Sequence, residues 1–314
     1  MKKVLVIDEF PQEVLAFFEE RFQFDYRPRI TADEVIDLIP AYEGLLLRSK
    51  MKLEHAFFEK ARKLEFIGRS GAGIENVDLE IAEGRGIKVF NSPEGNCNAV
   101  AEHALSMILS LLNKIPQGNR AVREGVWDRI ENRGSEIQDK VLGIIGYGNM
   151  GECFSKKARH LFKEVLVYDK YKSGFSEERI TEVELNELYQ SADIVSLHTN
   201  LTEETNQMVN AEFLSQFQKK VYLINTSRGQ VVDTAALMDA IDQNIVSGAC
   251  LDVLEFESLR FEALSLDELP EAFKRLSSSG KVILSPHVAG WTHESNIRMP
   301  QMLLEKIQTW YSER

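Results

Sequence analysis

Short apolar runs alternate with segments of helical periodicity along almost the whole chain. In the first hundred residues the apolar runs predict strands at Val4–Ile7, Phe22–Tyr26, Gly44–Leu47, Leu64–Gly68 and Ile87–Phe90. A second series predicts strands at Val141–Ile145, Val165–Tyr168, Ile194–His198, Val221–Asn225, Gly248–Asp252 and Lys281–Ser285. Strands that alternate with helices are typical of parallel sheets.

The segments between these runs predict the helices. In the first series they are Gln12–Arg21, Ala32–Ile39, Leu53–Arg62 and Val77–Gly84. A long, mostly apolar helix is expected over Asn98–Lys114 and a final helix over Glu294–Tyr311, while Arg123–Lys140 is polar and Glu255–Arg275 is acidic loop or short helix. The chain thus predicts an α/β fold of two Rossmann- or flavodoxin-like lobes, each a parallel sheet with helices on both faces and with the active site in the cleft between them. We expect residues 1–97 and 291–314 to form one domain and 98–290 the other.

Glycines follow the first strand of the second series at the spacing of a dinucleotide site. Gly146 permits a tight turn, Gly148 lets the backbone approach a pyrophosphate, and Gly151 lets the helix pack closely on the strand. The helix would start at Asn149 and Met150, where free N–H groups favour phosphate.

The next strand of that series ends at an acid. Asp169 can accept hydrogen bonds from the hydroxyls of an unphosphorylated ribose and would repel a 2′-phosphate. The predicted cofactor is therefore NAD rather than NADP, although Lys170 and Lys172 beside Asp169 weaken that preference.

Composition excludes several classes of protein. The net charge of −12 argues against a nucleic-acid surface, and 44% hydrophobic with 27% charged residues is typical of a soluble globular protein. Cys97, Cys153 and Cys250 have no C-x-x-C spacing, so we expect neither a metal site nor a disulfide framework. No signal peptide or membrane span is predicted, and we expect a cytoplasmic protein.

An arginine, a glutamate and a histidine each follow a predicted strand of the second lobe. Arg228 can hold a carboxylate with its planar fork, and His287 can exchange a proton near neutral pH. Glu257 would orient the imidazole and favour its charged form. These groups are what hydride transfer at a 2-keto or 2-hydroxy acid requires, with the cofactor carrying the hydride.

Other polar residues leave alternatives open. Glu255 is the fallback for Glu257, and His293 is the alternative base to His287. His103 is expected to be satisfied in the core, whereas His198 ends a strand and is expected to line the cofactor site. The turn at residues 71–73 is either a small anion nest or a plain strand-to-helix turn.

Taken together, these motifs resemble the D-isomer-specific 2-hydroxyacid dehydrogenase family over essentially the whole chain. The matching segments are Leu46–Ser49, Gly71–Asp78, Asn91–Asn96, Val100–Glu102, Gly125–Trp127, Leu142–Gly151, Asp193–His198, Asn225–Gly229, Leu251–Val253 and Ser285–Gly290. The resemblance implies catalytic roles for Arg228, Glu257 and His287, and a homodimer built through the nucleotide-binding domain. It also implies that Ala72 and Gly73 offer backbone to the substrate carboxylate and that Asp252 receives the nicotinamide carboxamide. Two further cofactor contacts are predicted within the matching motifs, at Thr226 and Gly290.

The chain departs from the family pattern after Glu257. Ser258 stands where the family commonly has a proline, and the stretch before His287 is longer and more acidic than usual. Arg48 and Ser49, followed by Lys50, resemble more weakly the phosphate-contacting region of D-3-phosphoglycerate dehydrogenases. We therefore expect them to bind substrate, and we expect no regulatory C-terminal domain after the last helix.

Two rival functions remain. One is an NAD(H)-sensing binding protein like the corepressor branch of the family, which the intact set of Arg228, Glu257 and His287 disfavours. The other is a different NAD enzyme on a related two-lobe scaffold, such as a formate dehydrogenase, which the basic run at Arg48–Lys50 does not suit.

Overall fold

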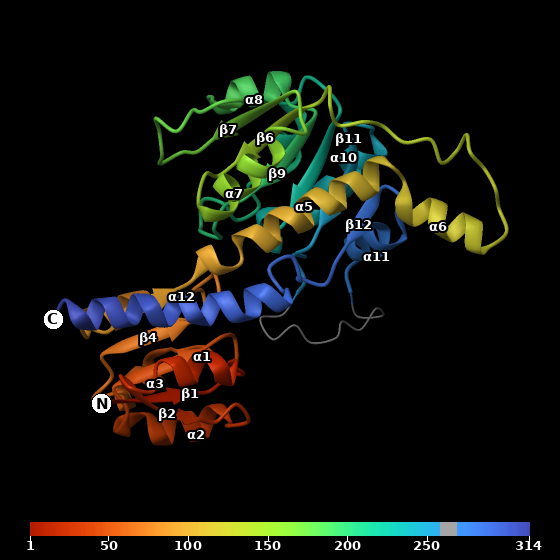
Figure 1. Ribbon diagram of the computed structural model, residues 1–314. Helices are drawn as coiled ribbons and strands as arrows, with labels where there is room; N and C mark the ends of the chain where they lie inside the picture. Colours follow the sequence, from red (N-terminus) through yellow and green to blue (C-terminus); the bar gives the residue numbers. More distant parts are fainter. Residues whose placement is uncertain (258–268) are drawn as a thin grey trace. The chain divides into compact units, whose positions relative to one another are not determined.

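The computed structural model describes residues 1–257 and 269–314, which form two compact units (Figure 1). Unit 1 comprises Met1–Asn96 and Trp291–Arg314, and unit 2 comprises Cys97–Gly290. None of the helices formed by the described residues is long and apolar enough to cross a membrane.

Unit 1 contains a five-stranded parallel sheet in the order β2-β1-β3-β4-β5. Its strands are β1 (Lys2–Val6), β2 (Phe22–Tyr26), β3 (Gly44–Leu47), β4 (Phe66–Arg69) and β5 (Lys88–Asn91). Its helices are α1 (Gln12–Phe17), α2 (Ala32–Leu38), α3 (His55–Lys60), α4 (Leu79–Gly84) and α12 (His293–Ser312), with 3-10 turns η1 (Ile39–Ala41) and η2 (Pro93–Gly95). This strand order is that of a flavodoxin-like sheet.

Helix α12 belongs to unit 1 because its apolar face is buried there. Leu303, Leu304 and Ile307 pack in one cluster with Val4 and Val6 of β1. The alternate residues of the same strands pack in a second cluster on the opposite face of the sheet. Both faces of the sheet are therefore covered, as a parallel sheet requires.

Unit 2 contains a seven-stranded sheet, also parallel throughout, in the order β12-β11-β10-β9-β6-β7-β8. Its strands are β6 (Val141–Ile145), β7 (Glu164–Tyr168), β8 (Ile180–Glu182), β9 (Ile194–Leu197), β10 (Val221–Asn225), β11 (Val246–Leu251) and β12 (Val282–Leu284). Its helices are α5 (Cys97–Leu112), α6 (Ile115–Arg123), α7 (Asn149–Ala158), α8 (Leu185–Ser191), α9 (Ala211–Ser215), α10 (Thr234–Asp242) and α11 (Glu271–Ser278), with the 3-10 turn η3 (Gly229–Val231). The chain order reverses between β6 and β9, which is where doubly wound sheets bind ligands.

The predicted α/β fold with two parallel sheets is confirmed, and every predicted strand is present within a few residues of its expected bounds. The sequence reasoning missed β8, a three-residue strand at the sheet edge, and helix α6. The polar residues of α6 gave no apolar stripe that would mark it as a core helix.

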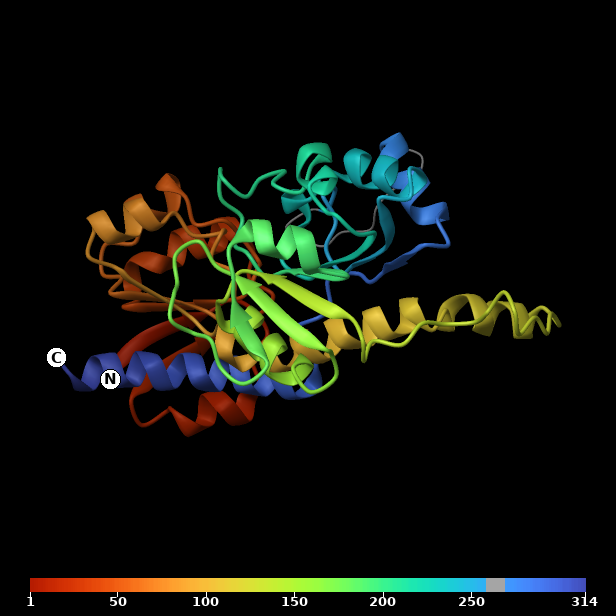
Figure 2. The same cartoon turned by 90° about the horizontal axis from the view of Figure 1, so that it is seen from above.

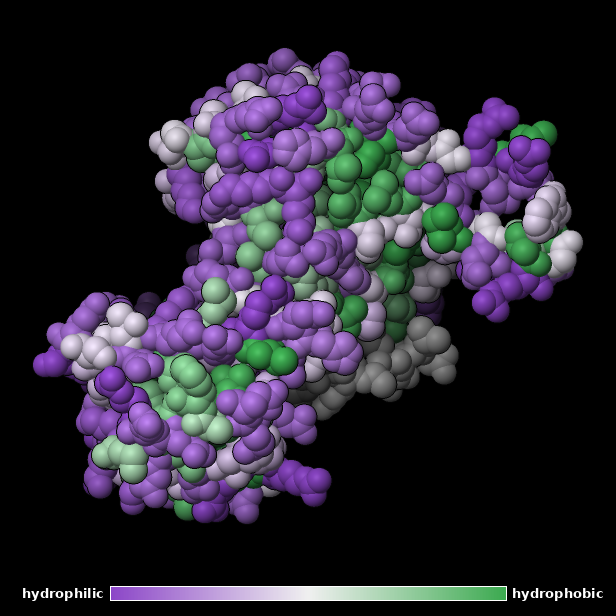
Figure 3. Space-filling model, in the orientation of Figure 1, coloured by the Kyte–Doolittle hydropathy of each residue, from purple (hydrophilic) through white to green (hydrophobic). Residues whose placement is uncertain are grey.

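Helix α6 and the segment after it extend away from the body of unit 2 (Figure 2). No residue of α6 is buried. Large apolar side chains are nevertheless exposed along this arm, which we define as residues 115–140: Ile115, Val122, Val126, Trp127 and Ile130. Trp127 is 79% exposed, so the description of this region as simply polar was incomplete. In Figure 3 hydrophobic and hydrophilic surface are mixed on the arm, which projects at the right of the view.

Candidate active site

The turn between β6 and α7 can be built only with glycine at two positions. Gly146 has a φ of +96°, and a Cβ there would lie 2.6 Å from the carbonyl oxygen of His198. A Cβ on Gly151 would lie 1.9 Å from the carbonyl oxygen of Gly146. The helix therefore starts directly against the strand, as a dinucleotide-binding turn requires.

Gly148 is different, because a Cβ there would meet no protein atom within 4 Å. It is the N-cap of α7, and no side chain caps the helix at this end. The first N–H groups of α7, beginning at Asn149 and Met150, thus have no side-chain acceptor and carry the positive end of the helix dipole. The open space before them fits a pyrophosphate.

Asp169 follows β7 and is held by backbone N–H groups. Its Oδ2 accepts from Tyr147 at 2.6 Å, and its Oδ1 accepts from Tyr171 and Lys172, each at 2.9 Å. Partial burial raises the pKa of Asp169, but these three hydrogen bonds outweigh it and hold the pKa below its usual value. A fixed, charged carboxylate at this position suits ribose hydroxyls and not a 2′-phosphate.

The lysines beside Asp169 are both engaged with the protein. Lys172 donates from Nζ to the carbonyl oxygen of Tyr147 at 2.8 Å, and Lys170 pairs with Glu204. The geometry therefore reduces the reservation that these two lysines raised about NAD.

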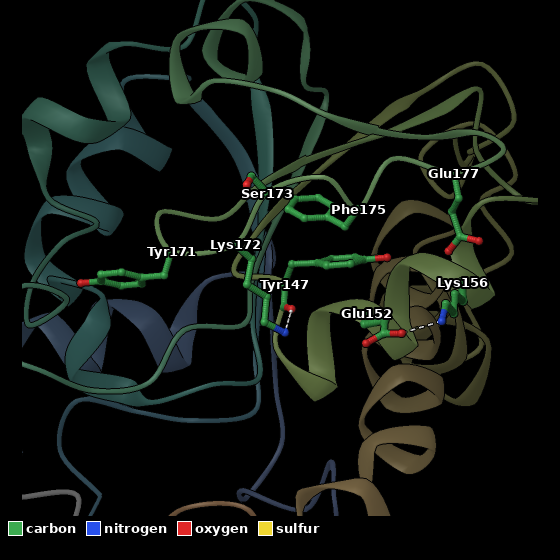
Figure 4. Close-up of a pocket in the computed structure, with 8 residues that line it drawn as sticks. All are labelled: Tyr147, Glu152, Lys156, Tyr171, Lys172, Ser173, Phe175 and Glu177. Atoms are coloured by element: carbon green, nitrogen blue, oxygen red, sulfur yellow. Dashed lines mark hydrogen bonds and ion pairs between the residues drawn. The ribbon is translucent and has the colours of Figure 1, made fainter.

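A pocket of about 600 Å³ adjoins this turn (Figure 4). It is lined by Tyr147, Glu152, Lys156, Tyr171, Lys172, Ser173, Phe175 and Glu177. The rings of Tyr147 and Phe175 stack with centroids 4.2 Å apart, and Lys156 donates to Glu152 at 2.5 Å. None of these side chains was predicted at the site, and Lys172 was named only as a neighbour of Asp169, since no motif marks a pocket formed by a loop folding back on a helix.

The backbone of His198 packs against the glycine turn at Gly146. Its imidazole is buried, with Nε2 2.9 Å from the Ser196 hydroxyl, while its carbonyl oxygen lies against Gly146. Burial lowers the pKa of His198 to about 4, so the ring stays neutral at physiological pH. The hydroxyl of Thr226, another predicted cofactor contact, is also buried and lacks a protein partner.

The predicted catalytic residues follow three neighbouring strands. Arg228 follows β10, Glu257 follows β11 and His287 follows β12. Because these strands are parallel and adjacent, their carboxyl ends meet at one edge of the sheet. The His287 Nδ1 lies 3.0 Å from Oε1 of Glu257, and the two side chains are 28% and 19% exposed. A carboxylate only accepts, so Nδ1 of His287 carries a hydrogen and donates to Glu257.

The loop that carries Arg228, residues 226–229, which we call the arginine loop, is folded around the side chain of Asn225. Its Oδ1 accepts from the N–H and the hydroxyl of Ser227, and its Nδ2 donates to the carbonyl oxygen of Arg228 at 2.9 Å. A Cβ on Gly229 would lie 2.0 Å from the backbone of Leu254. Glycine thus lets the arginine loop pack against the segment that leads to Glu257.

The geometry also distinguishes the alternatives. Glu255 accepts from the N–H of Thr234 at 3.1 Å and so supports the start of α10, whereas Glu257 faces His287. His293 is exposed as the first residue of α12, in unit 1. Ser258 lies outside the described residues.

Asp252 is buried, with 1% exposure, beneath the loop that carries His287. We call this loop, residues 285–290, the histidine loop. The carboxylate of Asp252 accepts from the Ser285 hydroxyl at 2.5 Å and from the N–H groups of Val288 and Ala289 at 2.9 and 2.8 Å. His103 is 2.9 Å from the same serine hydroxyl, so it is not simply a core histidine. Sequence reasoning had no signal that joined it to this loop, because 182 residues separate His103 from Ser285.

In unit 1, Arg48 is fixed by side chains of the final segment. Its Nη1 donates to Oδ1 of Asn296 at 2.6 Å, and its guanidinium lies 4.4 Å from the ring centroid of Trp291. Burial lowers the pKa of Arg48, against the attraction of Asp8 and Glu9.

The other predicted substrate contacts of unit 1 lie on neighbouring loops. Ser49 follows Arg48 directly, and Lys50 is occupied by the carbonyl oxygens of Pro28 and Ile30. Ala72 and Gly73 lie in the turn after β4, where the Ala72 carbonyl accepts from Asn91 at 2.6 Å.

The buried His198 generates a prediction about stability. Between its ordinary pKa of 6.5 and its folded value of about 4, the unfolded chain binds a proton that the folded chain excludes. The free energy of unfolding should therefore fall by roughly 1 kcal/mol per pH unit as the pH drops below 6.5. Urea titrations between pH 7 and 5 measure this, with His198→Gln expected to flatten the dependence. The exposed His55→Gln is the matched control and should keep it; equal slopes in all three proteins would contradict the assignment.

Comparisons with known proteins identify the family of the chain. The model of the family described as D-isomer specific 2-hydroxyacid dehydrogenase, NAD binding domain, matches residues 105–289. A D-3-phosphoglycerate dehydrogenase of Synechocystis sp. is 35% identical over 310 residues, covering 98% of this chain and 54% of that protein. A hydroxypyruvate reductase of Thermotoga maritima is 32% identical over 275 residues, covering 88% of this chain and 87% of that protein.

A solved structure of a D-lactate dehydrogenase from Aquifex aeolicus, complexed with NAD and lactic acid, aligns with a TM-score of 0.82. It is 27% identical, and the alignment covers 99% of this chain and 96% of that one. The chain spans about half the length of the phosphoglycerate dehydrogenases that it matches. The chain belongs to the D-isomer specific 2-hydroxyacid dehydrogenase family, and residues 105–289 match the family's NAD-binding domain.

Proposed function

We propose that the protein is an NAD-dependent oxidoreductase that transfers a hydride between nicotinamide and a D-2-hydroxy acid/2-keto acid pair. The observation that carries this proposal is the 3.0 Å contact between His287 and Glu257, at the same sheet edge as the glycine turn. 3-Phosphoglycerate is the leading substrate, since several relatives are D-3-phosphoglycerate dehydrogenases.

The chain's own residues would bind the substrate and move the proton. Arg228 holds the substrate carboxylate with its fork and polarises the neighbouring carbonyl. In the reduction, protonated His287 donates from Nε2 to the developing alkoxide, while Glu257 holds Nδ1–H and stabilises the imidazolium. In the oxidation, the neutral ring removes the hydroxyl proton. NAD, when bound, supplies or accepts the hydride.

The cofactor would lie over the glycine turn of unit 2. We assign the pyrophosphate to Gly148 and the first residues of α7, and the ribose to Asp169. The predicted nicotinamide-side contacts are Thr226, Asp252 and Gly290. For His198 we propose contact through the backbone only, because its ring is buried.

Unit 1 would bind the rest of the substrate, so that residues 1–97 and 291–314 act as the substrate domain and 98–290 as the NAD domain. We propose that Ala72 and Gly73 contact the carboxylate through their backbone. Arg48 and Ser49 are our candidates for a substrate phosphate, since the guanidinium is already ordered by Trp291 and Asn296.

We further propose a homodimer joined through the arm of unit 2. The arm exposes Trp127 and Ile130, at 79% and 74%, and large apolar side chains gathered at one place typically mark a contact surface. We also assign the protein to the reducing cytoplasm, an assignment supported by the fact that none of its three cysteines is in a disulfide.

Gly148→Ala tests the cofactor site. The structure leaves room for this methyl group, so stability should be unchanged, but the group would occupy the place of the pyrophosphate. The Kd for NADH should rise about tenfold or more, measured by fluorescence titration. Gly280→Ala, which likewise meets no atom within 4 Å and precedes β12, should leave the affinity unchanged; wild-type affinity in Gly148→Ala would remove the pyrophosphate from this position.

NADH oxidation at 340 nm with a panel of 2-keto acids, including 3-phosphohydroxypyruvate, tests the reaction. We expect turnover, with NADH preferred over NADPH, and a loss of about a hundredfold or more in kcat for His287→Ala with normal NADH binding. His293→Ala is the control and should retain activity. If no keto acid is reduced although NADH binds, the enzyme assignment fails and a sensor becomes the better reading.

Trp127→Asp tests the homodimer. A carboxylate in an apolar contact is unfavourable, so in analytical ultracentrifugation the variant should sediment as a monomer at concentrations where the wild type is dimeric. Tyr171→Asp, at a similarly exposed aromatic residue off the arm, should remain dimeric. A monomeric wild type at micromolar concentration would contradict the proposal.

A further inference from the structure

We propose that His103 is a positioning residue for His287, acting through Ser285 and Asp252. The inference rests on the proposed function of His287 as the proton donor. It concerns a side chain that directly follows the matching segment Val100–Glu102 but to which no role at the site was predicted.

A directed chain of hydrogen bonds links His103 to the buried carboxylate. The Ser285 hydroxyl has one hydrogen, and it donates this to Oδ1 of Asp252 at 2.5 Å, because a carboxylate only accepts. The contact of 2.9 Å between Nε2 of His103 and the same hydroxyl must then run from the imidazole to the serine. His103 therefore carries its hydrogen on Nε2. The same nitrogen lies 3.5 Å from Oδ1 of Asp252.

Asp252 in turn fixes the backbone on both sides of His287. Its carbonyl oxygen accepts from the N–H of His287 at 2.7 Å, and its two carboxylate oxygens accept from Val288 and Ala289. Every residue from Ser285 to Ala289 except Pro286, which has no N–H, thus donates a hydrogen bond to Asp252. The histidine loop is wrapped around a single buried carboxylate.

These hydrogen bonds matter because the backbone conformation of His287 is intrinsically unfavourable. Its φ is +54°, in the left-handed region that a non-glycine residue rarely adopts. Such a conformation persists only where the surroundings impose it. We call the hydrogen bonds from residues 285–289 to Asp252 the clamp. If the clamp is weakened, the backbone of His287 can relax and the imidazole rotates away from Glu257.

His103 controls the clamp because Asp252 is a carboxylate with 1% exposure. A buried charge needs hydrogen-bond donors on its lone pairs, and the hydrogen bond from His103 to the serine oxygen orients the hydroxyl so that its one hydrogen points at Oδ1 of Asp252. His103 is 25% exposed and projects from α5, the long helix that packs on β11 and β12. The helix thereby sets the orientation of the serine, and through it the aim of His287.

A purely structural role for His103 predicts a different outcome. Its ring would then only fill space between α5 and the sheet, and any apolar residue of similar size would replace it. The distinction is testable with His103→Leu, which keeps bulk and helix propensity, and His103→Gln, whose Nε2 can donate where the imidazole Nε2 does.

The first measurement compares kcat and KM for the preferred keto acid. His103→Leu should lower kcat about tenfold or more, since small misplacement of a catalytic group has effects of this size. KM and the Kd for NADH should stay within about twofold, and His103→Gln should recover most of kcat. Ser106→Ala is the matched control, because its hydroxyl donates only to the carbonyl oxygen of His103 within the same helix.

Ser285→Ala interrupts the chain of hydrogen bonds from His103 through Ser285 to Asp252, which we call the relay, and it tests the proposal independently if His103→Leu does not fold. It should lower kcat as His103→Leu does, and the double variant should be no worse than either single one, because both remove the same interaction. Full kcat in both single variants, equal losses in the Leu and Gln variants, or additive losses in the double variant would each overturn the proposal.

Imidazole ¹H–¹⁵N spectra give a readout that does not need turnover. The chain has six histidines, so the rings of His103 and His287 can be assigned from single variants. The wild type should show His103 with its hydrogen on Nε2, and the His287 signals should shift in His103→Leu and Ser285→Ala but not in Ser106→Ala. An unshifted His287 in both relay variants refutes the inference, whereas absence of wild-type turnover with these shifts present refutes only the proposed function.

Discussion

The parallel pairing of the strands in unit 2 is the constraint on which the site depends. Parallel strands end at the same edge, and the sheet order brings β12, β11, β10, β9, β6 and β7 together there. The glycine turn, Asp169, Arg228, Glu257 and His287 each follow one of these strands directly or within a few residues. Glu257 and His287, 30 positions apart, follow two adjacent strands and come into contact in this way.

Buried polar groups then give this edge its detail. Asn225 folds the arginine loop, Asp252 holds the histidine loop, and the backbone of His198 lies under the glycine turn. Asn225 and Asp252 have their side-chain oxygens engaged by the loops that they support, which offsets the free-energy cost of burying them. Close approach is the complementary device, since Gly151 and Gly229 each stand where any side chain would strike backbone. The loops that carry chemistry are thus fixed both by the strand ends and by close contacts with one another.

Several parts of this organisation were accessible from residue types alone. Apolar runs located the strands, and the spacing of Gly146, Gly148 and Gly151 ahead of Asp169 predicted the dinucleotide turn. Other parts were not accessible. Periodicity could not reveal α6, because its apolar residues are exposed and do not form a core stripe. It also could not identify the group that satisfies His103, since Ser285 lies at the end of a strand far along the chain.

The sequence by itself determined the two parallel sheets, the family and the identity of the residues at the strand ends. These follow from local patterns, in which a strand, a turn and a helix start occur within a few residues of one another. Only the tertiary structure decided that Glu257 rather than Glu255 faces His287, that the ring of His198 is buried, and that Asp252 clamps a left-handed histidine. Those outcomes depend on which loops meet, and contacts between loops are set by the register and twist of the whole sheet rather than by any segment of the chain.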